Sequence, residues 1–335
     1  MSQANETMKI SEKESDVIWK VKAVAIALTI CAHCNTVLEN ASFAARTVSY
    51  FLASLGSLGV PVFLFISGYL FSYKPLMKCI KTKVKSIIVP WLFCGTLVYL
   101  YVYLRKGQLS FSTYFEWIIG INTYLWYLSI SVFLIILGQC ICYISNRTRI
   151  TIQCIEIICI FISLGILFLE KIGVLAFHPY LNIFRWQWFF LLGMISRQRR
   201  LIDWIPSCVS PFVLGMISLL LLALTGKSIS YWNVYWGGVA VLAIMGVIML
   251  CKCINICYSC AMDIGKKSFS IYLLHMPVAG ITVNILNRFY DSIGFATILR
   301  PAVVLTITYI FIKTVEYFVK NKRIEPFVQQ VLGIR

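Results

Sequence analysis

Long apolar stretches separated by short polar segments run through almost the whole sequence. About 20 apolar residues, or slightly fewer, suffice to cross the hydrocarbon core of a bilayer as a helix. Stretches of this kind lie near residues 22–40, 50–72, 86–104, 123–144, 151–169, 183–197, 206–226, 231–250, 268–286 and 298–319. The pattern predicts an all-α integral membrane protein, a bundle of about ten transmembrane helices.

The connections between these stretches alternate sharply in basic charge. Of the 30 Lys and Arg residues, 21 lie in the tails and connections on one side of the predicted bundle and eight on the other. Because basic loops stay on the cytoplasmic side, we expect both polar tails, 1–20 and 320–335, in the cytoplasm. An even number of spans requires the same arrangement of the two termini.

The composition excludes a soluble enzyme. Hydrophobic residues make up 60% of the chain and charged residues only 13%, too few to cover a water-facing surface. A net charge of +17 would also suit a nucleic-acid partner, but the basic residues cluster in short loops between apolar stretches, so none is expected. No linker or low-complexity tract interrupts the chain, which predicts a single domain over 1–335.

The thirteen cysteines do not form a framework typical of extracellular domains, because none falls in a connection that we place outside. Cys251, Cys253, Cys257 and Cys260 follow the spacing C-x-C-x3-C-x2-C. Such a cluster could hold zinc, but ordinary reduced thiols beside a cytoplasmic loop explain it equally well. We therefore expect no metal.

The first apolar stretch carries a lysine at its start and a histidine within it. Lys22 and His33 are eleven residues apart, which places them within about 20° of the same helix face and about 16 Å apart along the axis. An imidazole among apolar residues needs a partner, and ionisable groups within membrane helices usually line a cavity or pathway. His33 is thus either a functional group or a hydrogen-bonded packing residue.

The ninth stretch contains a second histidine. His275 is expected about two turns inside the cytoplasmic edge, with Tyr272 three residues earlier on the same face and Pro277 shortly after it. Proline interrupts the backbone hydrogen bonds of a helix, which frees polar groups near the histidine. Two intramembrane histidines favour a cavity filled by water or substrate.

Basic and aromatic residues mark two further candidate sites. Lys81 and Lys85 lie four residues apart in a loop with five lysines, where they would either bind an anionic phosphate or simply orient the chain. Arg185 and Trp186 open the sixth stretch, and Trp126 opens the fourth. An arginine beside indoles suits a sugar or carboxylate, although snorkelling to the interface and an aromatic belt are the simpler interpretations.

Several short segments, in this order, resemble the bacterial membrane acyltransferases of the acyltransferase 3 family, which includes O-acetyltransferases of surface polysaccharides. They are the Lys22 and His33 pair, V-F-L-F-I-S-G-Y-L-F, K-S-I-I-V-P-W, L-W-Y-L, F-R-W-Q-W-F-F-L-L-G and S-F-S-I-Y-L-L-H-M-P. The chain departs from the family's pattern at Lys22, where many members have arginine, and at Tyr124, where many have histidine.

The resemblance implies a cytoplasmic acyl-CoA donor, an essential His33 and a basic loop that matters for activity. On this hypothesis a multi-pass protein of the bacterial inner membrane moves an acyl group, in the first place acetyl from acetyl-CoA, to a hydroxyl of a cell-envelope glycan or lipid-linked sugar. His33 would act as general base, with His275 and Tyr272 handling protons. The donor phosphates would be held by Lys22, Lys81 and Lys85, and the acceptor by Arg185, Trp126 and Trp186.

A transporter or flippase for a glycan intermediate is the alternative. In such a protein the same histidines would line a pathway and no bond would be made. The basic cluster at the cytoplasmic end of the predicted bundle discriminates between the enzyme and the transporter, because a CoA site requires it and a flippase does not.

Overall fold

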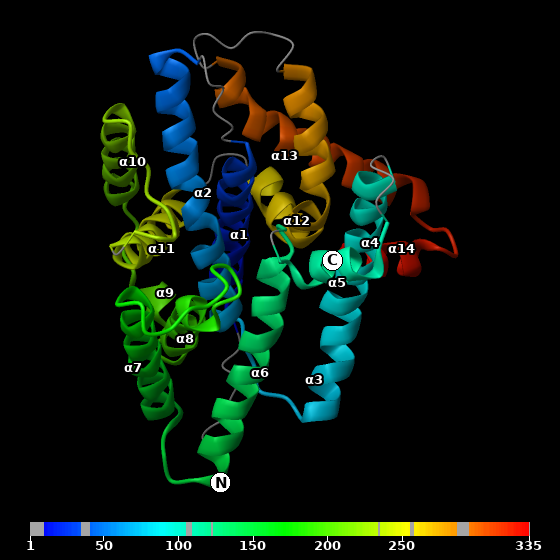
Figure 1. Ribbon diagram of the computed structural model, residues 1–335. Coiled ribbons are helices and arrows are strands. Elements are labelled where there is room, and N and C mark those ends of the chain that lie inside the picture. Colours follow the sequence, from blue (N-terminus) through cyan, green and yellow to red (C-terminus); the bar gives the residue numbers. More distant parts are fainter. Residues whose placement is uncertain are drawn as a thin grey trace. The chain divides into compact units, whose positions relative to one another are not determined.

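The computed structural model of the chain describes residues 10–34, 41–104, 109–121, 123–233, 235–254, 258–286 and 295–334 (Figure 1). In these ranges every regular element is a helix and none is a strand, so the predicted all-α class is confirmed. Each of the ten expected apolar stretches overlaps one of these helices in its described part. The elements are α1 (Glu12–His33), α2 (Phe43–Tyr69), α3 (Leu76–Lys83), η1 (Val84–Ile88), α4 (Val89–Leu104), α5 (Phe111–Ile119), α6 (Trp126–Arg147), α7 (Ile152–Lys171), α8 (Ile183–Gln198), α9 (Leu201–Trp204), α10 (Ser210–Leu224), α11 (Trp236–Cys253), α12 (Tyr258–Leu286), α13 (Phe295–Val319) and α14 (Glu325–Leu332).

Six of the described helical segments are both long enough and apolar enough to cross a membrane. They are Phe43–Tyr69, Leu76–Leu104, Trp126–Arg147, Ile152–Lys171, Trp236–Cys253 and Ala296–Val319. Four other helices that we expected to cross are not among these six: α10 has 15 residues, α8 has 16, α1 carries six charged residues in its first half, and the fourth is the 29-residue α12. The structure therefore supports a multi-pass membrane protein and contains six candidate spans among the described residues.

The chain forms two compact units. The first contains Leu64–Trp204, and the second combines Glu12–Phe63 with Ile205–Arg335. In the first unit α8 packs against α6 and α7, and α5 packs against α4. In the second, α12 packs along α1 and α13, while α1 also contacts α11 and α13. The second unit thus surrounds α1, and with it His33, by helices from the C-terminal third of the chain.

Close backbone contacts depend on two glycines of α2. A Cβ on Gly56 would clash with the backbone of Ala32, the residue before His33, so α1 and α2 touch directly beside the histidine. In the first unit a Cβ on Gly68 would clash with the carbonyl of Phe190 in α8. The Ser67-Gly68 interruption of the aromatic run therefore serves packing, since small residues let helices approach closely.

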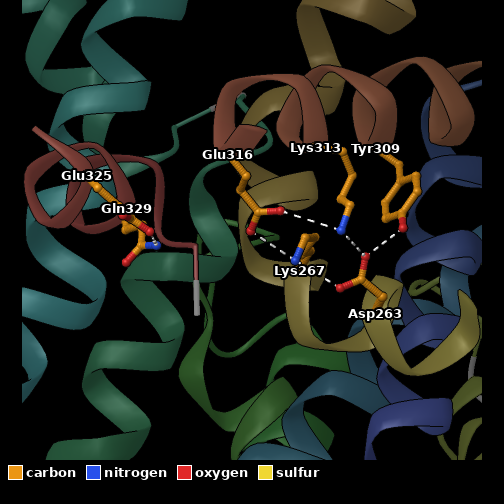
Figure 2. Close-up of polar contacts among 7 residues, drawn as sticks. All are labelled: Asp263, Lys267, Tyr309, Lys313, Glu316, Glu325 and Gln329. Atoms are coloured by element: carbon orange, nitrogen blue, oxygen red, sulfur yellow. Dashed lines mark hydrogen bonds and ion pairs between the residues drawn. The ribbon is translucent and has the colours of Figure 1, made fainter. Parts of the chain in front are cut away.

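An ion network joins the N-terminal part of α12 to the C-terminal part of α13 (Figure 2). The Nζ of Lys267, itself buried, lies 2.9 Å from Asp263 Oδ1 and 3.0 Å from Glu316 Oε1. Tyr309 donates a 2.6 Å hydrogen bond to Asp263 Oδ2, and the Lys313 Nζ lies 3.3 Å from the same oxygen. A buried lysine is tolerated here because two carboxylates compensate for its lost hydration.

Candidate functional site

The two intramembrane histidines of the sequence meet in the second unit. The rings of His33, at the end of α1, and His275, within α12, have centroids 5.1 Å apart and planes inclined at 49°. His275 is fully buried, whereas His33 is partly exposed. Of the two histidines, His33 therefore has the larger solvent-exposed fraction.

One hydrogen bond defines the tautomer of His275. Its Nδ1 lies 2.7 Å from the carbonyl oxygen of Tyr272, one turn earlier in α12. A carbonyl oxygen only accepts, so Nδ1 carries the hydrogen and donates it. In the neutral ring Nε2 then bears the lone pair. The ring of Tyr272 has its centroid 5.9 Å from that of His275, so the expected pairing of these two residues holds, with the tyrosine backbone making this bond.

An arginine that sequence reasoning missed belongs to the same unit. Arg300 is only 1% exposed and shares an inward stripe of α13 with Thr297, Val304 and Thr308. It lies close enough to Cys34, the residue after His33, to interact with it electrostatically. In the sequence, Arg300 is one of the eight basic residues that we placed on the less basic side of the bundle. The sequence signal that could have indicated a buried arginine is its position, followed by Pro301, at the start of the apolar stretch 298–319.

The two lysines of α1 have different surroundings. Lys20 is buried and donates hydrogen bonds from Nζ to the carbonyls of Cys251, at 3.4 Å, and Ile254, at 3.0 Å. These carbonyls end α11, where a positive charge is favourable. Lys22 is partly exposed, with its Nζ 4.5 Å from the centre of the Trp19 ring. Lys20 therefore joins two helices, whereas the Lys22 charge remains accessible at the surface.

The predicted basic loop of the first unit is helical. Lys81 lies in α3 and Lys85 in the π-helical turn η1, and both side chains are exposed, as is that of Lys78. Within α3 only Cys79 is buried. Single π turns inside longer helices are frequent at functional sites. An exposed row of lysines on a helix can meet an anionic ligand without first breaking a contact within the protein.

The first unit also brings together the predicted acceptor residues. The rings of Trp126 and Trp186 have centroids 4.6 Å apart, and the Arg185 Nη2 lies 3.1 Å from Glu170 Oε2. Asn182 donates a hydrogen bond to the same oxygen at 2.9 Å. Sequence reasoning missed Glu170, which ends the preceding helix. Both indoles and Asn182 are buried, whereas the side chains of Arg185 and Glu170 are each 17% exposed and therefore more accessible than the aromatic pair.

The ion network is the other charged cluster that sequence reasoning missed. Burial alone would raise the pKa of Asp263, but hydrogen bonds from Tyr309 and Lys267 and the lysine charges hold it below its usual range. Burial alone would lower the pKa of Lys267, but Asp263 and Glu316 raise it. Both shifts favour the charged forms, so Asp263 and Lys267 form an ion pair.

The cysteine cluster does not form a metal centre in the described part of the chain. Cys251 is buried, Cys253 is half-buried and Cys260 is exposed, while Cys257 lies outside the described residues. No group of three or more His, Cys, Asp or Glu side chains in the described ranges is arranged to hold a metal ion.

Most of the chain matches a known protein family. A family model described as an acyltransferase domain matches residues 21–315. The matched range begins one residue before Lys22 and includes both histidines, Arg300 and the candidate residues of the first unit. No curated protein and no solved structure matches the chain.

Proposed function

The chain belongs to the acyltransferase 3 family, and from this premise we propose that it transfers an acyl group, in the first place acetyl, from cytoplasmic acyl-CoA to a hydroxyl of a cell-envelope glycan or lipid-linked sugar. We place the protein in the bacterial inner membrane, with about ten spans, both termini in the cytoplasm and one acyltransferase domain made of both units. The family favours this enzyme over a transporter with the same histidines.

The meeting of His33 and His275 is the observation that carries the mechanism. Neutral His33 takes the proton of the acceptor hydroxyl as the oxygen attacks the thioester carbonyl, a usual role of a neutral imidazole in general base catalysis. When the carbon–sulfur bond breaks, the departing CoA thiolate takes this proton from His33. The products are the acyl ester and free CoA.

His275 supports this step from behind His33. Its Nδ1–H is held by the carbonyl of Tyr272, so its Nε2 lone pair is the part that can stabilise the positive charge that forms on His33. Because the two ring centroids lie only 5.1 Å apart, the two rings cannot both be charged without strong repulsion. We therefore propose that the pair carries at most one positive charge during the reaction, from the proton that His33 takes from the acceptor hydroxyl.

Arg300 supplies a fixed positive charge to the same unit. A guanidinium stays protonated at any physiological pH, so it stabilises negative charge without competing for the proton that His33 moves. In acyl transfer the negative charge develops on the carbonyl oxygen, and preorganised donors in a dry site act on it strongly. We assign Arg300 to that oxygen.

Substrate contacts are assigned to each unit separately. In the second unit Lys22 is our candidate for a donor phosphate, because its charge is accessible. In the first unit the exposed pair Lys81 and Lys85 is the corresponding candidate. For the acceptor sugar we assign Arg185, with its partner Glu170 and the adjacent Trp126 and Trp186, since charged and aromatic groups together suit a polyhydroxylated ring.

Release of free CoA tests this function. Purified protein in proteoliposomes receives labelled acetyl-CoA together with envelope glycan from cells that lack the gene, and both free CoA and labelled glycan ester are measured. We expect the two products in equal amounts. Comparing the O-acetyl content of envelope glycans with and without the gene identifies the acceptor. Unchanged acetyl-CoA, combined with movement of glycan across the vesicle membrane, would support the transporter instead.

A further inference from the structure

The chain continues beyond its last membrane span into a structured basic turn and a short helix. The candidate span Ala296–Val319 ends at a buried valine, and Lys320, Lys322 and Arg323 follow with exposed side chains. Three cations in four residues at the end of a span lie where the headgroups of the adjoining leaflet are expected.

The turn between α13 and α14 has a defined conformation. Asn321 adopts the left-handed region, with a φ of 60°, and its backbone N–H donates to Glu325 Oε2 at 2.7 Å. The other carboxylate oxygen accepts a 2.9 Å hydrogen bond from Gln329, one turn later in α14 (Figure 2). Glu325, the acidic residue nearest in sequence to the three cations, is thereby held against its own helix, and the three cationic side chains are exposed.

The helix α14 has one buried side and one exposed apolar side. Val331 and Leu332 are buried, as is Ile334 after the helix, and α14 packs on α13. Ile324, just before the helix, is 54% exposed, and Phe327, three residues later on the same face, is 64% exposed. Exposed apolar side chains beside cations are typical of a helix that lies in the membrane interface.

This surface continues the lipid-facing side of α13. Tyr317 and Phe318, in its last turn, are largely exposed, and both lie within the candidate span. We call the combined surface the basic–aromatic patch; its members are Tyr317, Phe318, Lys320, Lys322, Arg323, Ile324 and Phe327. A soluble phosphate would meet the cations but leave the aromatic rings in water. A phospholipid would satisfy both.

We propose that the basic–aromatic patch is a binding site for anionic phospholipid, with Lys320, Lys322 and Arg323 on the headgroup and Ile324 and Phe327 among the acyl chains. Juxtamembrane basic clusters gain binding energy from negatively charged leaflets, and this gain weakens as salt screens the charges. The site is independent of the acyl transfer chemistry, so it stands or falls separately from the proposed function.

The test measures binding of fluorescent phosphatidylglycerol and phosphatidylcholine to the full chain in mild detergent. We expect the triple variant Lys320→Gln, Lys322→Gln, Arg323→Gln to bind phosphatidylglycerol about tenfold or more weakly, and to lose most of the salt dependence. Phosphatidylcholine binding should not change. The matched control replaces Arg147, Arg149 and Arg199, three exposed arginines of the first unit, with glutamine, and should behave as the parent protein does.

A second variant, Phe327→Ser, addresses the apolar half of the site. It should weaken phosphatidylglycerol binding at every salt concentration and leave the salt dependence as it is. Equal phosphatidylglycerol affinity in the triple variant and the arginine control would overturn the proposal. So would displacement of bound phosphatidylglycerol by acetyl-CoA at micromolar concentration, because the patch would then belong to the donor.

Discussion

The imidazole rings of His33 and His275 lie with their centroids 5.1 Å apart, although one histidine ends the first helix of the chain and the other lies within the twelfth. His275 is buried and has its Nδ1–H held by a carbonyl, while His33 is partly exposed. This asymmetry separates two tasks. In the proposed mechanism His33 contacts the acceptor hydroxyl and His275 acts on His33.

Replacement of His275 tests this division of labour. We expect His275→Gln to lower kcat about 10- to 100-fold with little change in the donor KM, because a positioning group acts on the charged state of His33 and not on substrate binding. The pH profile of kcat should shift, which loss of a merely structural contact would not cause. Steady-state kinetics over pH 5–9 measure both. A rise in KM at constant kcat would contradict the assignment.

Arg300 offers a second test of the proposed chemistry. Removing a single donor to a developing oxyanion typically costs about 100- to 1,000-fold in kcat, so Arg300→Ala should lose activity on this scale. Added guanidine, which restores the missing cation, should recover part of the rate in Arg300→Ala and none in His33→Ala. The matched control is Thr308→Ala, on the same buried stripe of α13. Full activity of Arg300→Ala in protein that elutes normally on gel filtration would remove Arg300 from the mechanism.

We expect replacement of Lys22 to affect binding of the acyl donor and replacement of Lys20 to affect the stability of the protein. Lys22→Gln is expected to raise the apparent KM for acetyl-CoA several-fold, increasingly so at low ionic strength, and to leave thermal unfolding unchanged. Lys20→Gln should instead lower the unfolding temperature, because the carbonyls that end α11 lose their buried partner. Lys22→Arg, which keeps the charge, should retain most of the donor affinity. The reverse pattern would show that the two roles were assigned the wrong way round.

The ion network predicts how stability depends on pH. The pKa of Asp263 is lowered from its model-compound value of 3.8, so its contribution is present above that value and is lost as the pH falls through the lowered pKa. The pKa of Lys267 is raised above 10.5, so its contribution is present below that value and is lost as the pH rises further. The contribution of the network should thus be flat between about pH 5 and 9.

Thermal unfolding of wild type and Asp263→Asn in detergent measures this dependence. Below about pH 4 the difference in unfolding temperature between the two proteins should shrink, because wild type then loses the same charge that the variant lacks. A difference that stayed constant down to pH 3 would show that the Asp263 carboxylate adds nothing beyond its neutral hydrogen bonds.

The long apolar stretches of the sequence located the helices well, because lipid-facing and core positions of a membrane helix are both apolar. The sequence also suggested a cavity near the two histidines. It did not show that His33 and His275 would meet, since the packing of α1 against α12 depends on side-chain fit between segments far apart in the chain. For the same reason Glu170 was not paired with Arg185 before the structure placed them 3.1 Å apart.

The charges inside helices were the hardest to interpret from sequence. Arg300 and Lys267 both looked like loop residues that orient the chain, because the end of an apolar stretch is uncertain by several residues. Their burial became visible only when the stripe of α13 and the carboxylates around Lys267 were in place. The expected number of about ten spans stays a prediction beyond the six candidate spans of the described residues, because apolar stretches such as 183–197 are helical but short.

The most direct test of the account is the rate of CoA release by His33→Ala. Loss of a general base should lower kcat about 100- to 10,000-fold, while the donor KM and the unfolding temperature stay close to those of wild type. His178→Ala, which removes the third histidine of the chain from the connection between α7 and α8, serves as the matched control and should retain normal kcat. If His33→Ala released CoA and formed glycan ester at a rate similar to that of His178→Ala, the central role of His33 would be contradicted.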